Sequence, residues 1–183
     1  RIFNHDDPAK YLNSPETPLY HKGSTLYGLQ ATRDSIRKNG SAILVEGYMD
    51  FLKLYQGSIT NILAISGTAF TKEHTSSLHR ITKKVVLLYD GDDAGANAVI
   101  KAGWILLKGD LDPLVVRPPN GLDPDDWIDK AGKKGVQQLI LNPKSYISFN
   151  ILFHKGDTLK GADRKEYITY LAKEIKNIDE CNT

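Results

Sequence analysis

The stretch "VVLLYDGDDAG" (Val85–Gly95) decides the fold of this 183-residue chain. Five apolar residues lead directly into three aspartates within four positions. A short apolar run bounded by turn-forming residues is typical of a strand that is buried on both faces. Carboxylates this close together repel one another unless protons or a cation neutralise them. The stretch therefore predicts a buried strand whose carboxyl end holds a group of charges that needs a partner.

Three more apolar runs predict strands of the same sheet. They cover residues 42–46, 61–65 and 113–117, and segments with helical spacing lie between them. Strands that alternate with helices indicate βαβ units, a parallel sheet and helices on both of its faces. No strand is expected after Pro143, because residues 145–178 contain only amphipathic helix patterns. The predicted fold class is therefore α/β, a parallel-sheet domain with a preceding irregular segment and an appended C-terminal helical piece.

The composition is that of an ordinary globular protein, with 40% hydrophobic residues, 25% charged residues and a formal net charge of +2. This charge neither favours nor excludes a polyanionic partner, so any basic patch must be local. Cys181 is the only cysteine, which excludes an intrachain disulfide, argues against a cysteine-based zinc site and fits a reducing cytoplasm. No apolar run approaches the ~20 residues of a membrane span, so no membrane partner is expected. The chain opens without a methionine on a polar segment, which predicts that it begins inside a larger protein.

Acidic residues follow the predicted strands at their carboxyl ends, which is the edge where open parallel sheets bind ligands. Six carboxylates are expected to meet there: Glu46, Asp50, Asp90, Asp92, Asp123 and Asp125. Carboxylate oxygens are hard ligands that suit Mg²⁺ or Mn²⁺. A set of this size can hold two ions ~4 Å apart, the arrangement that stabilises the attacking and leaving oxygens in phosphoryl transfer.

Each aspartate also has a purely structural interpretation. An aspartate between a strand and a helix is a common N-cap, and Asp93 is interpreted as the residue that caps the following helix. Asp50 can be a first-turn acid favoured by the helix dipole. Asp123 and Asp125 can each belong to a turn or a cap. The functional interpretation therefore depends on all the acids meeting at one edge.

Several other templates are missing from the sequence. It contains no phosphate-binding P-loop, no dinucleotide-binding glycine motif, no HExxH zinc motif and no complete EF-hand loop. His74 and His79 have no matching ligand cluster and are interpreted as helix-surface residues. The acids after the strands remain the one constellation that points to chemistry.

Two of these acidic segments together resemble the Toprim signature. "VEGYMD" (Val45–Asp50) provides a Glu after one strand, and "YDGDDAG" (Tyr89–Gly95) provides Asp-x-Asp after another. That signature is shared by bacterial primases, type IA and type II topoisomerases and some nucleases. Taken alone, it leaves these classes open.

Three further segments narrow the resemblance to the bacterial DnaG-type primases. They are "KYLNSPETPLYHKGSTLYGL" (Lys10–Leu29), "SGTAFT" (Ser66–Thr71) and "GLDPDDWI" (Gly121–Ile128), which match that family in order and spacing. The resemblance covers about residues 10–150. It implies that residues 1–26 end an upstream subdomain of the primase core, that 27–143 form a Toprim catalytic domain, and that 144–183 begin a C-terminal helical subdomain.

The resemblance implies template-directed synthesis of short RNA primers on single-stranded DNA by two-metal nucleotidyl transfer. Glu46 would be the acid closest to the chemistry, as metal ligand or proton acceptor. The five aspartates of the set would hold Mg²⁺, for which Mn²⁺ can substitute, and the triphosphate of the incoming ribonucleotide. Asp90 and Asp92 count with Glu46 as catalytic residues.

The resemblance also assigns roles outside the acidic set. Lys10, Asn13 and Lys22 match family residues that contact nucleotide or template, although the lysines can equally be solvated surface residues. Zinc is expected only in an N-terminal domain that this chain lacks. Contact with the replicative helicase is expected through another absent domain. A cytoplasmic monomer is expected.

Two rivals outside the Toprim group remain. In a haloacid-dehalogenase-like phosphatase, Asp90 would be the nucleophile, but Ala94 stands where that family has Thr or Val, and Glu46 has no use. A receiver-like signalling domain would take a phosphoryl group on one aspartate. It needs an adjacent acid pair after its first strand and a lysine after its last, and this sequence provides neither clearly.

Overall fold

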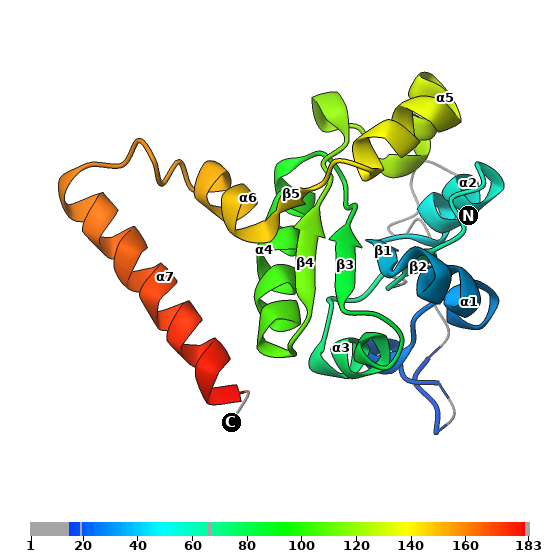
Figure 1. Cartoon of the computed structure of the whole chain (residues 1–183), viewed down its shortest axis with the longest axis horizontal. Coiled ribbons are helices and arrows are strands. Elements are labelled where there is room, and N and C mark those ends of the chain that lie inside the picture. The colour runs from blue at the N-terminus through cyan, green and yellow to red at the C-terminus, as the bar shows by residue number, and fades with distance from the viewer. Residues whose placement is uncertain (1–14, 19, 66, 182–183) are drawn as a thin grey trace.

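A computed structural model of the chain describes residues 15–18, 20–65 and 67–181. It confirms the predicted α/β class, with one sheet in the order β2-β1-β3-β4-β5 between two layers of helices (Figure 1). The strands are β1 (Ser41–Val45), β2 (Ile62–Ala64), β3 (Lys84–Leu87), β4 (Asp112–Val115) and β5 (Lys144–Ser145). The α-helices are α1 (Leu29–Asn39), α2 (Tyr48–Gln56), α3 (Lys72–His79), α4 (Asp93–Lys108), α5 (Pro124–Ile140), α6 (Tyr146–Phe153) and α7 (Gly161–Cys181). Two 3₁₀ helices are η1 (Lys22–Ser24) and η2 (Pro119–Gly121).

The central strands β1 and β3 are buried on both faces, as their continuous apolar runs predict. They pair in parallel, with Leu44 opposite Leu87. Successive side chains point to opposite faces of a sheet. The face that carries Leu44 and Leu87 packs against α1, α3, α4 and α6, and the face that carries Ile43 and Val86 packs against α2 and α5. Because β1 to β4 are parallel, their carboxyl ends meet at one edge.

Glycines account for two interruptions of helical structure. Gly40 follows α1 in a left-handed conformation with φ 66° and closes the helix. α5 is interrupted at Gly132, where φ is 67° and ψ is 169°. α5 therefore consists of two shorter helices with a kink between them.

The expectation that no strand follows Pro143 was wrong. β5 pairs antiparallel with β4 and sets Ser145 opposite Leu114. Both β5 residues are exposed and neither is apolar, so the sequence pattern carried no strand signal. The sheet is thus mostly parallel, with an antiparallel edge strand.

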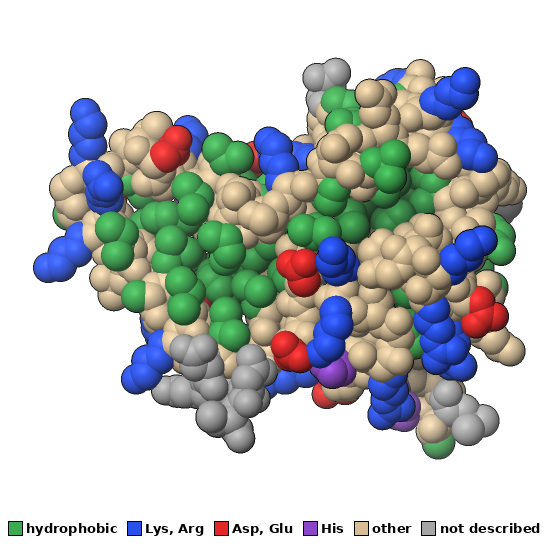
Figure 2. Space-filling model, viewed as in Figure 1, with side chains coloured by type: hydrophobic (Ala, Val, Ile, Leu, Met, Phe, Trp, Pro, Cys, Tyr) green, Lys and Arg blue, Asp and Glu red, His purple; other side chains and the backbone are tan. Residues whose placement is uncertain are grey.

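The C-terminal helices are tied to α4 by hydrogen bonds from aromatic side chains. The Tyr146 hydroxyl donates to the Ile100 carbonyl oxygen at 2.7 Å, and Trp104 Nε1 donates to the Tyr170 hydroxyl at 2.6 Å. Figure 2 shows apolar side chains gathered on the molecular surface over α6 and α7. Leu152, on α6, is 53% exposed. In the described residues, no helix is both long and apolar enough to span a lipid bilayer.

His74 is buried, so its interpretation as a surface residue was wrong. Its Nδ1 accepts a hydrogen bond from the Thr71 amide at 3.2 Å, which completes the capping box of α3. Its Nε2 lies 3.1 Å from the Lys22 carbonyl oxygen. His74 therefore attaches the N-terminal segment to the sheet domain. His79 is exposed on α3, as predicted.

Candidate functional site

The predicted carboxylates lie on the segments that follow β1, β3 and β4 at the carboxyl edge of the sheet. Electrostatic interactions link all of them. Each carboxylate either shifts the pKa of another member or has its own pKa shifted by one. We call this set the acidic rim: Glu46, Asp50, Asp90, Asp92, Asp123 and Asp125. The parallel topology brings these residues together from three parts of the sequence.

Three of the rim acids also begin helices. Asp50 Oδ2 accepts a hydrogen bond from the Gly47 amide at 3.0 Å at the start of α2. Asp92 Oδ1 accepts from the Gly95 amide at 2.7 Å at the start of α4. Asp123 plays the same part for α5. Three helix N-termini, with their partial positive charge, therefore point at one edge of the sheet.

The structure corrects the choice of capping residue in the DGDD segment. Asp92 is the N-cap of α4, and Asp93 is the first helical residue with a side chain that is 97% exposed. The helix begins one residue earlier than the interpretation of Asp93 as the cap required. A cap uses one carboxylate oxygen, so capping by Asp92 does not exclude metal binding through its other oxygen.

Glu46 and Asp50 carry the clearest electrostatic signature of the rim. Burial, followed by the charges of Asp90 and Asp92, raises the pKa of Glu46 to about 7, although a hydrogen bond from the Asp90 backbone acts in the opposite direction. Burial likewise raises the pKa of Asp50 to about 7, with Asp90 the next cause. Two largely buried acids with pKa values near neutrality lack a neutralising partner, which a cation would supply.

A second part of the rim lies at the start of α5. One carboxylate oxygen each from Asp123, Asp125 and Asp126 lies within 4.8 Å of the others, close enough to hold one metal ion. Burial, followed by the neighbouring Asp123, raises the pKa of Asp125 to about 6. Asp126 was missing from the predicted set, although its place directly after Asp125 in "DPDD" could have indicated it.

The two parts of the rim are joined through Gly91. Its amide donates to the Leu122 carbonyl oxygen at 2.8 Å, and its own carbonyl oxygen accepts from Arg117 Nε at 3.0 Å and Nη2 at 2.7 Å. A Cβ at Gly91 would lie 2.8 Å from Leu122 O and 2.9 Å from Pro118 O, so no side chain fits there. Sequence reasoning missed Arg117, although a cation just after one strand, beside a neighbouring strand that ends in acids, is a usable signal.

The predicted basic residues are not brought into the acidic rim by any described contact. Lys22 lies in η1, where its amide donates to Glu16 Oε1 at 2.9 Å and its carbonyl oxygen contacts His74. Lys10 and Asn13 lie outside the described residues. The roles of these three residues therefore stay predictions.

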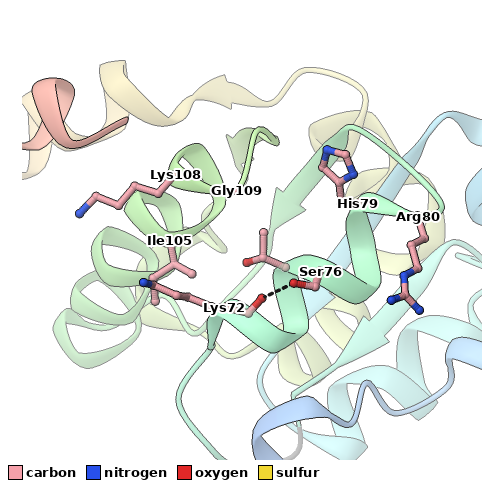
Figure 3. Close-up of a pocket in the computed structure, with 8 residues that line it drawn as sticks. Lys72, Ser76, His79, Arg80, Ile105, Lys108 and Gly109 are labelled. Carbon is pink, nitrogen blue, oxygen red and sulfur yellow. Dashed lines mark hydrogen bonds between the residues drawn. The ribbon is translucent and has the colours of Figure 1, made fainter. Parts of the chain in front are cut away.

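A basic cavity of about 460 Å³ lies between α3 and α4 and not at the rim. Lys72, Arg80 and Lys108 project around it, and the Ser76 hydroxyl donates to the Lys72 carbonyl oxygen (Figure 3). Its lining includes Gly109, which lies just before the amino end of β4, whereas the acids follow the carboxyl ends of the strands. The cavity therefore belongs to the other end of the sheet.

The donor chemistry of the rim fits divalent cations. Its side chains offer only carboxylate oxygens, which are the ligands that Mg²⁺ and Mn²⁺ prefer. The raised pKa values of Glu46, Asp50 and Asp125 show that these charges are not neutralised by the protein itself. Such a site can bind a metal together with a phosphate-bearing ligand, and the adjoining helix N-termini favour anions.

Two models of known protein families match this chain. A Toprim-like family matches residues 43–128, which contain the whole acidic rim. The N-terminal domain of the DNA primase catalytic core matches residues 1–33.

Individual relatives agree with these families. The chain is 35% identical to the DNA primase of Listeria innocua over 185 residues, which is 99% of this chain and 30% of that protein. A crystal structure of the Aquifex aeolicus primase, containing zinc-binding and RNA polymerase domains, is 41% identical with a TM-score of 0.74 and covers 78% of this chain and 36% of that one. A DnaG primase catalytic domain bound to single-stranded DNA is 31% identical with a TM-score of 0.82, covering 94% of this chain and 56% of that one. The chain thus spans less than a third of the length of the curated relatives it matches.

Proposed function

This chain belongs to the bacterial DnaG-type DNA primases, and from that membership we propose that it forms the Toprim part of an RNA-polymerizing active site. The proposed reaction is template-directed synthesis of short RNA primers on single-stranded DNA. The observation that carries the proposal is the acidic rim, where acids from three strand ends meet and where the pKa values of Glu46 and Asp50 are raised to about 7. The rim lies within the segment that matches the Toprim-like family.

In this proposal the rim binds and orients the incoming ribonucleoside triphosphate. Asp90 and Asp92 would hold the cations that neutralise its phosphates, beside Glu46. Glu46, with a pKa near neutrality before any cation binds, accepts the proton of the attacking 3′-hydroxyl or acts as a ligand. The N-termini of α2, α4 and α5 add partial positive charge where negative charge develops.

We propose Mg²⁺ as the physiological ion and Mn²⁺ as its substitute. When bound, the ions would neutralise the triphosphate and stabilise both the attacking and the leaving oxygen of the transferred phosphoryl group. Glu46, Asp50, Asp90 and Asp92 would form one part of the ligand set. Asp123 and Asp125, joined by the neighbouring Asp126, would form the other.

The partners follow from the family. The relative bound to single-stranded DNA supports a single-stranded template for this protein as well. Ribonucleoside triphosphates are the proposed substrates, with Lys10, Asn13 and Lys22 proposed to contact nucleotide or template. Zinc and the replicative helicase would be bound by domains outside this chain, in a cytoplasmic monomer. The proposed division into residues 1–26, 27–143 and 144–183 follows from the same membership.

The rival functions are not favoured. The relatives given above are DNA primases, and no topoisomerase, nuclease or phosphatase is among them. A phosphatase that uses Asp90 as nucleophile would also leave the raised pKa of Glu46 without a purpose.

Primer synthesis by the full-length protein tests the proposal. Glu46→Gln and Asp90→Asn should each reduce synthesis on a single-stranded template by about 100-fold or more, since both remove charge at the reacting centre. Asp93→Asn is the matched control, because Asp93 lies in the same DGDD segment with its side chain 97% exposed. It should retain near wild-type synthesis. Undiminished synthesis by both rim variants would refute the assignment.

A further inference from the structure

Two buried polar atoms near the rim have no hydrogen-bond partner among the described residues. One is the hydroxyl of Tyr89, the last residue of the apolar run, which is 2% exposed. The other is Oε1 of Glu46. A buried donor or acceptor without a partner is costly and is rare in folded proteins. Two such atoms in neighbouring segments therefore call for a common explanation.

The register of β1 and β3 places the two residues next to each other. Leu44 lies opposite Leu87, and the Leu88 amide donates to the Leu44 carbonyl oxygen at 2.9 Å, which continues the ladder toward the rim. Continuing this register by two residues past Leu44 and Leu87 sets Glu46 opposite Tyr89, just beyond the ends of β1 and β3. Neighbouring strands lie about 4.8 Å apart.

The electrostatics agree with this placement. The charge of Glu46 acts on the Tyr89 hydroxyl, so the two side chains lie within electrostatic reach of each other, and the phenol O–H is a hydrogen-bond donor. The Glu46 carboxylate offers the complementary acceptor. A water with polar partners on two sides commonly satisfies buried groups of this kind.

Oε1 is the buried oxygen of the Glu46 carboxylate. Solvent does not reach this oxygen, and it accepts no hydrogen bond from the described residues. Tyr89 is the neighbouring side chain whose donor is also unused.

We propose that Tyr89 is a positioning residue for Glu46, whose hydroxyl donates through one buried water to Oε1 and so keeps the second carboxylate oxygen turned toward the rim. The inference rests on the proposed function, because it assigns Glu46 to metal or proton chemistry. Residues that orient metal ligands in this way commonly affect metal affinity without touching the metal.

The test is Tyr89→Phe in the full-length primase, assayed for primer synthesis as a function of free Mg²⁺. Phe keeps the buried ring, so the variant should fold. The Mg²⁺ concentration for half-maximal synthesis should rise about ten-fold, the usual size of a ligand-orienting effect. The KM for the ribonucleotide at saturating Mg²⁺ should stay unchanged, which a general loss of structure would not produce.

Tyr146→Phe is the matched control. Tyr146 belongs to the same buried cluster, but its hydroxyl is already used by Ile100 and Asn150 and lies on α6. Its loss should lower thermal stability and leave the Mg²⁺ requirement of the folded enzyme at the wild-type value.

A wild-type Mg²⁺ requirement in Tyr89→Phe would overturn the inference, and a simultaneous rise in Tm would identify the hydroxyl as simply unpaired. Glu46→Gln in the same assay separates this failure from that of the proposed function. If Glu46→Gln loses synthesis while Tyr89→Phe behaves as wild type, only the role of Tyr89 is wrong. If Glu46→Gln retains synthesis, the proposed function itself fails.

Discussion

Arg117 donates two hydrogen bonds to the Gly91 carbonyl oxygen, from Nε at 3.0 Å and from Nη2 at 2.7 Å. Arg117 follows β4, and Gly91 stands between Asp90 and Asp92 after β3. The same glycine donates its amide to Leu122, just before Asp123. One arginine therefore helps to fix the distance between the two parts of the acidic rim without contributing a ligand.

Arg117→Met should weaken catalysis because it removes both donors and keeps an unbranched apolar stem. We expect synthesis to fall about ten-fold with a higher Mg²⁺ requirement, the usual effect of losing a residue that supports metal ligands. Steady-state rates across a Mg²⁺ titration measure it. Arg80→Met, an exposed arginine by the α3–α4 cavity, is the control and should behave as wild type. Equal rates for the two variants would contradict the role of Arg117.

Gly95→Ala should disrupt the turn that carries Asp90 and Asp92. A Cβ at Gly95 would lie 2.3 Å from the Asp90 carbonyl oxygen and 3.0 Å from its amide nitrogen, and backbone atoms cannot move aside cheaply. We expect a loss of about 1–3 kcal/mol in the free energy of unfolding, together with a loss of primer synthesis.

The control for that variant is Gly23→Ala, whose Cβ would make an ordinary 3.7 Å contact with the Thr71 methyl group. Thermal unfolding of both variants gives the comparison. If Gly95→Ala is as stable as Gly23→Ala, the close approach of Gly95 to Asp90 is not a constraint on the site.

The stability of the metal-free protein should fall as pH rises from about 4.5 to 7. The pKa values of Glu46 and Asp50 are raised from 4.5 and 3.8 to about 7, so in this range the folded state binds protons that the unfolded state has released. Stability decreases with pH wherever the folded state binds more protons. Mg²⁺ replaces those protons, so the increase in Tm on adding Mg²⁺ should grow from pH 5 to pH 8.

Thermal unfolding with EDTA and with Mg²⁺ across that range measures the effect. The double variant Glu46→Gln/Asp50→Asn should lose most of the pH dependence of the Mg²⁺ response. A Mg²⁺-induced Tm increase that is the same at pH 5 and pH 8 in the wild type would argue against proton–metal competition at the rim.

Short sequence patterns predicted those parts of the fold that depend on residues close together in the sequence. The apolar runs marked β1 and β3, because a strand that is buried on both faces requires apolar residues at every position. The meeting of Glu46 with Asp90 also followed from the sequence, since parallel strands put their carboxyl ends at one edge.

The features that the sequence did not predict depend mostly on contacts between residues far apart in the chain, which no short sequence pattern reveals. Arg117 reaches Gly91 across 26 positions, and His74 reaches Lys22 across 52. The capping role passed from Asp93 to Asp92 because helix starts are uncertain by a residue when acids are adjacent. The sequence did not predict β5, because Lys144 and Ser145 form no apolar pattern and join the sheet by backbone pairing with β4.

His74→Leu should loosen the N-terminal segment that carries Lys22. It leaves the Thr71 amide and the Lys22 carbonyl oxygen without their imidazole partner, at a cost of about 1–3 kcal/mol for a buried group. We expect a lower Tm and, since Lys22 is proposed to contact nucleotide or template, a higher KM for the ribonucleotide. His79→Gln, on the exposed side of the same helix, should change neither quantity. A wild-type Tm for His74→Leu would show that this attachment is unimportant.

Anomalous X-ray diffraction from primase crystals soaked in Mn²⁺ would locate a metal at the acidic rim without relying on activity. An anomalous peak is expected within about 2.1 Å of carboxylate oxygens of Glu46 and of Asp90 or Asp92. A second peak is expected beside Asp123 and Asp125. Manganese bound only elsewhere, with the rim carboxylates empty under conditions that support primer synthesis, would contradict this metal assignment.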